Sequence, residues 1–332
     1  MAPPLKTIDT HTHYFPQTYI DLIAKYGKRC GATVITGDKG ATFIQVGLLL
    51  RTGPIVREFM DIDARLKIMD RQGLGMHALS LTQPMVYWAD DDLGAQLCMA
   101  FNDAISAAHV AHRDRLIGFA CLPFQSPILA LEELERAARL PGIRGIYMGT
   151  AVRDRELSDR SLFPVYERCE ALGLPIFLHP MMINNERLKQ YYLINLCGNP
   201  FDTAIAASHL IFGGVLDAFP KLDISLPHAG GVLPILRGRM DRGFDIRAEC
   251  KTIAKPPSTY LKRFTYDTIS YDEEVLEDLV RLVGADRIMV GSDYCFDIAY
   301  EEPVKFVHGV KSLSAEQRQQ ILWGNAAKLL KL

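Results

Sequence analysis

The sequence predicts an α/β fold, a (β/α)8 barrel of the TIM type, with a small β element inserted after the first strand. Eight short strand-like runs can be counted, helical segments separate nearly all of them, and 332 residues suffice for one such barrel domain over 1–332. The expected strands lie near residues 6–10, 77–82, 116–122, 143–148, 175–179, 222–227, 264–268 and 287–292. A doubly wound open sheet is the alternative, but no Gly-x-Gly-x-x-Gly follows the first strand, which weakens a dinucleotide-binding fold.

Residues 14–60 interrupt the alternation of strands and helices. This segment is rich in glycine and contains short β-prone runs at 32–36 and 42–50. Its glycines are Gly27, Gly31, Gly37, Gly40, Gly47 and Gly53. We therefore expect 14–60 to form an inserted hairpin or small sheet over one end of the domain, and not a crossover helix.

Capping residues at their ends predict several of the helices between the strands. Asp61 or Asp63 can cap a helix that runs to about Arg71 before Gly73 stops it, and Asp90 precedes a helix that runs to about His112. Further helices are expected near 126–140, 161–172, 200–218, 232–248, 272–282 and 315–330.

Composition argues against several classes of function. The net charge is −2 with acidic and basic residues interspersed, which does not suggest a nucleic-acid or membrane surface. The N-terminus has no apolar signal core, and no stretch of 18 apolar residues occurs. The seven cysteines are scattered and no two are three residues apart, so we expect neither a zinc ribbon nor a redox pair but buried thiols in a cytoplasmic protein.

Candidate metal ligands follow four of the expected strands. His11 and His13 are two apart at the end of the first strand and so share one face, although this pair alone is a weak signal. His179, His228 and Asp293 follow the fifth, sixth and eighth strands. The active site of a (β/α)8 barrel lies at the carboxyl ends of its strands, so these side chains converge if the sheet closes. The pattern predicts a metal site.

Nitrogen and oxygen donors of this kind suit Zn²⁺ best, with Mn²⁺, Co²⁺ or Fe²⁺ possible. We expect His11, His13, His179 and Asp293 to bind the metal. His228 suits proton transfer near neutral pH, with a fifth ligand or a hydrogen bonder beside the metal as the alternative. A binding protein with a structural zinc is disfavoured, because such sites are usually closed by cysteines.

Several motifs together resemble the amidohydrolase superfamily, and within it the branch of non-oxidative decarboxylases that includes the 2-amino-3-carboxymuconate-6-semialdehyde decarboxylase family. The resemblance covers nearly the whole chain. It rests on His11-Thr12-His13, Ile68-Met69-Asp70-Arg71-Gln72-Gly73, Leu178-His179-Pro180, Pro227-His228-Ala229-Gly230-Gly231, Lys255-Pro256-Pro257-Ser258, Gly291-Ser292-Asp293-Tyr294 and Gly324-Asn325-Ala326-Ala327-Lys328.

The resemblance implies one zinc with a water, held by the four ligands named above, and His228 as the acid/base residue. It also implies a homodimer in which an arginine enters the neighbouring subunit's active site, and Arg239 falls at the matching position. By itself, the basic run around Arg239 is more typical of a solvated helix face. For a second substrate-binding arginine, Arg51 and Arg57 compete. Phe296 and Tyr191 match aromatic pocket residues, the latter a tryptophan in the family.

Two aspartates are candidates for supporting roles. Asp267, at the end of the seventh strand, could orient a ligand histidine, or it could be an ordinary turn residue. Asp9 could do similar work from the first strand.

The function expected from these features is metal-dependent, oxygen-independent decarboxylation of a small unsaturated or aromatic carboxylic acid. His228 would move a proton, and Arg239 with a second arginine would bind a carboxylate. Asp293 could take part in the proton transfer. The alternative is a hydrolase or hydratase of a small amide, lactone or unsaturated diacid, which would use the same metal site.

Overall fold

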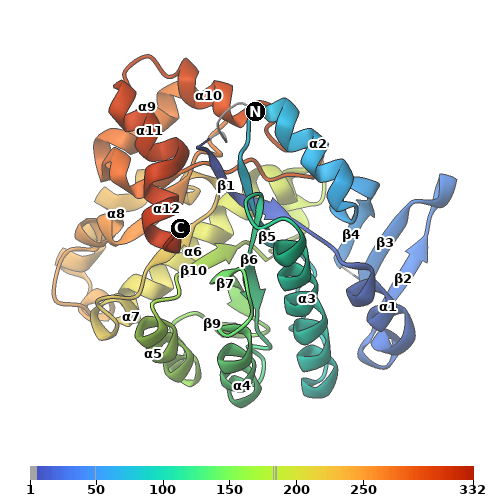
Figure 1. Ribbon diagram of the computed structural model, residues 1–332. Helices are drawn as coiled ribbons and strands as arrows, with labels where there is room; N and C mark the ends of the chain where they lie inside the picture. Colours follow the sequence, from blue (N-terminus) through green and yellow to red (C-terminus); the bar gives the residue numbers. More distant parts are fainter. Residues whose placement is uncertain (1–5, 49, 182, 184) are drawn as a thin grey trace.

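A computed structural model of the protein describes residues 6–48, 50–181, 183 and 185–332. Eight parallel strands form one sheet in the order β1-β5-β6-β7-β10-β11-β12-β13. They are β1 (Ile8–His13), β5 (Met76–Ser80), β6 (Leu116–Cys121), β7 (Ile143–Gly149), β10 (Ile176–His179), β11 (Ile224–Leu226), β12 (Phe264–Asp267) and β13 (Ile288–Met289). The sheet closes where the amide of Thr10 donates to the carbonyl of Val290 at 2.9 Å. The predicted barrel is confirmed (Figure 1).

Helices surround the barrel and connect its strands (Figure 1). Those expected from the capping signals begin and end where predicted: Asp61 accepts a hydrogen bond from the Ala64 amide at 3.0 Å, and Gly73 ends the same helix in the left-handed conformation. The helices after the inserted segment are α2 (Ile62–Gln72), α3 (Asp91–Ala111), α4 (Pro127–Ala137), α5 (Phe163–Leu172), α6 (Asn199–Phe212), α7 (Val215–Ala218), α8 (Leu233–Ile246), α9 (Glu273–Val283), α10 (Pro303–Gly309), α11 (Ala315–Gln319) and α12 (Asn325–Leu330).

The first strand differs from its predicted bounds. We expected it to end at residue 10 with the histidines beyond it, but β1 continues through His13 and all six of its residues are buried. Its pairing with β5 shifts register between Asp9 and Thr12. The prediction failed because the mouth of the barrel is lined by polar side chains, so the apolar alternation that marks a strand stops before the strand does.

The inserted segment contains a helix as well as a sheet. Strands β2 (Ala32–Thr36), β3 (Thr42–Val46) and β4 (Leu50–Ile55) form an antiparallel sheet that projects from the barrel (Figure 1). Helix α1 (Gln17–Tyr26) precedes them, where we expected no helix. It buries Tyr19, Ile20 and Ile23 on one face, which packs against α3. A short hairpin, β8 (Ala151–Val152) and β9 (Arg155–Glu156), extends from β7.

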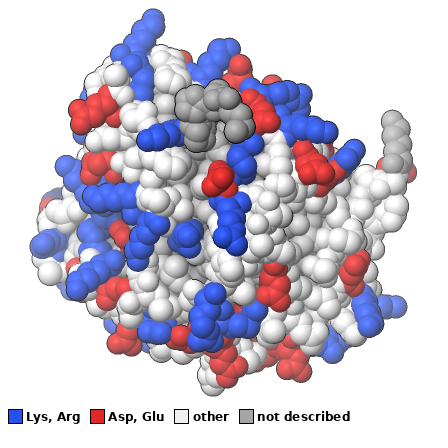
Figure 2. All heavy atoms as spheres, viewed as in Figure 1, with Lys and Arg blue, Asp and Glu red and all other residues white. Residues whose placement is uncertain are grey.

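The surface agrees with the charge pattern of the sequence. Basic and acidic side chains are interspersed on the face drawn in Figure 2. Within the described ranges, no helix combines the length and apolar character needed to cross a membrane.

Candidate metal centre and active site

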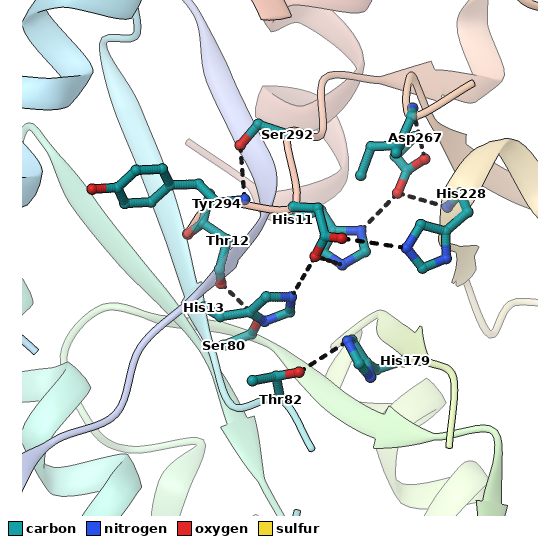
Figure 3. A network of polar contacts seen from close by, with 12 residues as sticks. His11, Thr12, His13, Ser80, Thr82, His179, His228, Asp267, Ser292 and Tyr294 are labelled. Carbon is teal, nitrogen blue, oxygen red and sulfur yellow. Dashed lines mark hydrogen bonds and ion pairs between the residues drawn. The ribbon is translucent and has the colours of Figure 1, made fainter. Parts of the chain in front are cut away.

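Four histidines and one aspartate from the ends of four strands meet at the carboxyl end of the barrel. The ring centroid of His11 lies 5.1 Å from that of His13, 5.8 Å from that of His179 and 5.2 Å from that of His228. Figure 3 shows the four rings gathered around one point. Asp293 completes the group, with Oδ1 at 3.0 Å from His13 Nε2 and 3.6 Å from His11 Nε2. The strands thus bring together all five predicted residues.

The donor atoms of this group fit a divalent cation. Ligand atoms of His11, His13 and His179 lie within 4.8 Å of one another, and so do those of His11, His228 and Asp293. His11 Nε2 is buried without a hydrogen-bond partner, as expected for a nitrogen that a cation occupies. In His179, the ring nitrogen Nδ1 lies 2.9 Å from the carbonyl oxygen of Pro180. The second ring nitrogen, Nε2, is therefore the atom that could bind a cation.

Asp267, the last residue of β12, orients two of the histidines. Its Oδ2 lies 2.8 Å from His11 Nδ1 and accepts a hydrogen bond from the backbone amide of His228 at 3.0 Å. Its Oδ1 accepts from the amide of Ala229 at 2.9 Å. A proton on His11 Nδ1, shared with this carboxylate, turns the lone pair of Nε2 toward the other donors. Asp267 thus makes the contact with His11 that its predicted orienting role requires (Figure 3).

Burial and hydrogen bonding set the ionisation of the group. Burial lowers the pKa of His13 to about 4 and holds the pKa of His179 well below its usual range. Burial alone would raise the pKa of Asp293, but hydrogen bonds with His13 and His228 keep it well below its usual range. At neutral pH, the imidazoles of His13 and His179 are therefore neutral and face an ionised carboxylate, as metal binding requires of these three groups. Burial alone would lower the pKa of His11, but its hydrogen bond with Asp267 and the charge of Asp293 raise it.

The backbone is strained at the same residues. His228, Ala229 and Asp293 have φ values of 53°, 54° and 62°, in the left-handed region that non-glycine residues rarely adopt. Asp267 holds the first two through their amides, and the amide of Asp293 donates to the carbonyl of His11 at 3.0 Å. Such strain occurs mainly at functional sites, where the surrounding structure maintains it.

Two cavities meet at this centre. Both are lined by His228 and Asp293, and both include Asn195 and Asn199. The smaller cavity, about 430 Å³, lies beside the inserted sheet, and the larger, about 750 Å³, lies between α8 and α9. Volumes of this size accommodate a small organic ligand.

Among the predicted substrate-binding residues, Arg51 and Phe296 line the smaller cavity. Phe296 packs on His13 with ring centroids 5.3 Å apart. Arg57 lines neither cavity and instead pairs with Asp61 at 2.5 Å on the surface. The structure therefore favours Arg51 over Arg57.

Two other predicted residues lie outside the cavities. Tyr191 is 83% exposed and lines neither of them, whereas the adjacent Tyr192 lines the smaller one, so the expected aromatic wall is displaced by one residue. Arg239 is exposed on α8 and also lines neither cavity of its own chain.

Three further polar residues line the site but were not predicted from the sequence. Asn195 belongs to a π-helical turn, Ile194–Gly198, and Asn199 begins α6, so no strand-end rule points to either. Thr82, two residues after β5, places Oγ1 3.1 Å from His179 Nε2 and lines the smaller cavity. The rule that identified the histidines could have identified Thr82 as well.

Comparison with known proteins identifies the family. Residues 8–332 match the family model described as amidohydrolase. This chain belongs to the amidohydrolase family. The 2-amino-3-carboxymuconate-6-semialdehyde decarboxylase of Dictyostelium discoideum is 33% identical to it, over 98% of this chain and 91% of the relative.

Two further relatives of this chain are also decarboxylases. The gamma-resorcylate decarboxylase of a Polaromonas species is 31% identical over 81% of this chain and 87% of the relative. The crystal structure of a dihydroxybenzoic acid decarboxylase from the same Polaromonas strain, with bound manganese and the inhibitor 2-nitroresorcinol, has a TM-score of 0.82 at 27% identity, covering 98% of this chain and 97% of that one.

Proposed function

We propose that this protein is a metal-dependent, non-oxidative decarboxylase that acts on a small unsaturated or aromatic carboxylic acid. It is a carboxy-lyase of the amidohydrolase superfamily. The observation that carries the assignment is that His228, Asp293 and Arg51 line the same cavity. The relatives of this chain are decarboxylases.

We further propose His11, His13, His179 and Asp293 as the metal ligands. Zinc suits this donor set best, and manganese is the first alternative because the Polaromonas relative holds it. Co²⁺ or Fe²⁺ also fit such donors. When bound, the cation supplies Lewis-acid polarisation of a substrate oxygen.

The chain's own residues supply binding and proton transfer. A carboxylate of the substrate pairs with the Arg51 guanidinium, and Phe59 and Phe296 pack against the unsaturated carbon skeleton. The carbon–carbon bond to the departing CO2 breaks, and its electron pair remains on the substrate carbon. His228 donates a proton to that carbon. Its Nε2 lies 3.8 Å from Asp293 Oδ2, so the two side chains would exchange a proton through a bridging water or after a closer approach.

A homodimer with Arg239 supplied across its interface belongs to this proposal. Exposed apolar side chains surround the larger cavity, among them Leu196, Ile235 and Val275, which are 50%, 80% and 49% exposed. Ile235 and Arg239 are four residues apart on α8 and so lie on the same face of that helix. A second copy that covered this face would bring its own Arg239 toward the cavity.

A cytoplasmic location also remains part of the proposal. Its support is that all seven cysteines are free, as expected in a reducing compartment.

The experiment that tests the proposed function measures CO2 release from a panel of carboxylated muconates, hydroxybenzoates and aminobenzoates by zinc-loaded protein. We expect release by the wild type and loss of turnover in a folded His228→Ala variant. Turnover of amides, lactones or unsaturated diacids without CO2 release would identify a hydrolase or hydratase instead.

A further inference from the structure

A fully buried arginine lies beneath the proposed metal centre. Arg65, in the middle of α2, is 0% exposed and is the largest fully buried side chain among the described residues. In the described part of the chain, its guanidinium pairs directly with no carboxylate. Burial of an uncompensated charge is costly, so the contacts of Arg65 need an explanation.

On one side, Arg65 contacts both segments that carry metal-ligand candidates. Its Nη2 donates to the backbone carbonyl of His13, at the end of β1. The same nitrogen lies 3.5 Å from the Sγ of Cys295, two residues after Asp293. The guanidinium also lies 5.0 Å from the centroid of the Tyr294 ring. Arg65 therefore links the His13 end of β1 to the segment after Asp293.

On the other side, the imidazole of His77 lies between Arg65 and the carboxyl group of Asp9. Arg65 Nη1 lies 3.3 Å from Nδ1 of His77, which is also 0% exposed. An Nδ1 that accepts from arginine leaves the proton on Nε2, and His77 Nε2 lies 4.0 Å from Asp9 Oδ2. Both of these atoms are buried without a hydrogen-bond partner in the described structure, so each is the nearest polar group available to the other.

Asp9 also connects β1 to the segment that carries Asp293, through hydrogen bonds at a second position. Its Oδ1 accepts hydrogen bonds from the amides of His11 at 3.0 Å and Ser292 at 3.2 Å. The residues so held are one proposed ligand and the neighbour of another. Arg65 and Asp9 thus fix β1 against the Asp293 segment at two places, and His77 lies between them.

We propose that Arg65, acting through His77 and Asp9, is a positioning residue that holds His11, His13 and Asp293 in the geometry that binds the metal. The inference rests on the proposed metal centre. It differs from a purely structural role because it predicts an effect on metal retention, whereas an ordinary buried arginine would affect only stability.

The test measures the rate at which zinc leaves the purified, zinc-loaded protein to a chelator, together with circular dichroism and thermal unfolding. We expect Arg65→Met to release zinc about 10- to 100-fold faster than the wild type, the range usual for groups that orient metal ligands. Arg155→Met is the matched control. Arg155 is half-buried, donates to the carbonyls of Phe124 and Gln125, and lines neither cavity.

Two substitutions of His77 test the link to Asp9 and serve if Arg65→Met does not fold. His77→Leu removes both ring nitrogens, whereas the amide of His77→Gln supplies one acceptor and one donor. We expect faster zinc release from His77→Leu and partial restoration in His77→Gln. The inference is overturned if folded Arg65→Met or both His77 variants release zinc at the rate of the control. Failure of the wild type to hold zinc or another divalent cation would refute the metal centre itself.

Discussion

At the scale of single residues, His11 combines the features that mark the site. Its Nδ1 is tied to Asp267, and its Nε2 is buried without a partner in the described structure. A buried polar atom left unpaired costs about 1–3 kcal/mol. A cation bound to Nε2 would remove that cost. The unpaired nitrogen is unfavourable in the metal-free protein and is therefore consistent with a metal site.

The two competing arginines give a matched pair of substitutions. Arg51→Ala should lower kcat/KM about 10- to 100-fold, mainly through KM, because a charge-assisted hydrogen bond to a carboxylate contributes about 1.5–3 kcal/mol. Arg57→Ala should leave kcat/KM within about twofold, because exposed pairs such as Arg57–Asp61 contribute little. Steady-state kinetics on the substrate found in the panel would decide. Equal effects of the two substitutions would contradict the placement of Arg51.

The residues of the site differ in how well sequence predicts them. His179 ends a strand, and His228 and Asp293 follow strands closely, so the position of each strand end in the barrel determines where the side chain lies. Tyr191 and Tyr192 belong to a long connection and both have positive φ, at 56° and 62°. No periodicity governs such a segment, so sequence could not indicate which of the two tyrosines faces the cavity.

At the scale of elements, the helices with clear caps were predicted well and the elements near the site less well. The caps at Asp61 and Asp90 are local, so their hydrogen bonds follow from neighbouring residues. Helix α1 was missed because its apolar face is short and the glycines after it dominate the pattern of 14–60. The end of β1 was missed because histidines replace apolar residues inside the barrel.

Helix α6 carries a carboxylate that fixes the segment after β10. Asp202, in the first turn of α6, accepts from the Thr150 hydroxyl at 2.5 Å and from the Met181 amide at 2.6 Å. Burial raises the pKa of Asp202 to about 6, above its usual 3.8. The folded state therefore keeps a proton that the unfolded state has lost, and stability from this group falls as pH rises from about 4 to 6.

Asp202→Asn removes this titration while keeping an oxygen acceptor. About two pKa units correspond to roughly 3 kcal/mol at most. The free energy of unfolding of the wild type should fall relative to that of Asp202→Asn between pH 4 and 6, with a constant difference above pH 7. Denaturant unfolding of both metal-free proteins at several pH values measures this difference. A difference that does not change with pH would contradict the raised pKa.

At the scale of the whole molecule, barrel closure makes the site. His11 and Asp293 are separated by nearly the entire chain, yet their side chains lie 3.6 Å apart because β1 meets the last strand. The order of the strands therefore explains why residues distant in sequence could be predicted as one group. Exposed apolar side chains line the larger cavity, so a second copy that covered them in the proposed dimer would also contact the site.

The proposed shared site predicts complementation between two inactive chains. In a mixed dimer of Arg239→Ala and His228→Ala, one site receives both defects and the other receives neither. Random mixing should restore about a quarter of wild-type activity, because half of the dimers are mixed and each has one intact site. Activity is measured after unfolding and refolding the two chains together, with each chain refolded alone as the control. Mixed dimers without recovered activity would exclude the shared site.

In the proposed reaction, CO2 leaves the substrate and a proton from His228 takes its place. The most direct measurement runs the reaction in D2O without oxygen, on the substrate found in the panel, and counts CO2 and deuterium in the product. We predict one CO2 and one deuterium per turnover, with the deuterium on the carbon that lost CO2 and no product from His228→Ala. A requirement for oxygen, or a product that keeps its carboxylate, would contradict the account.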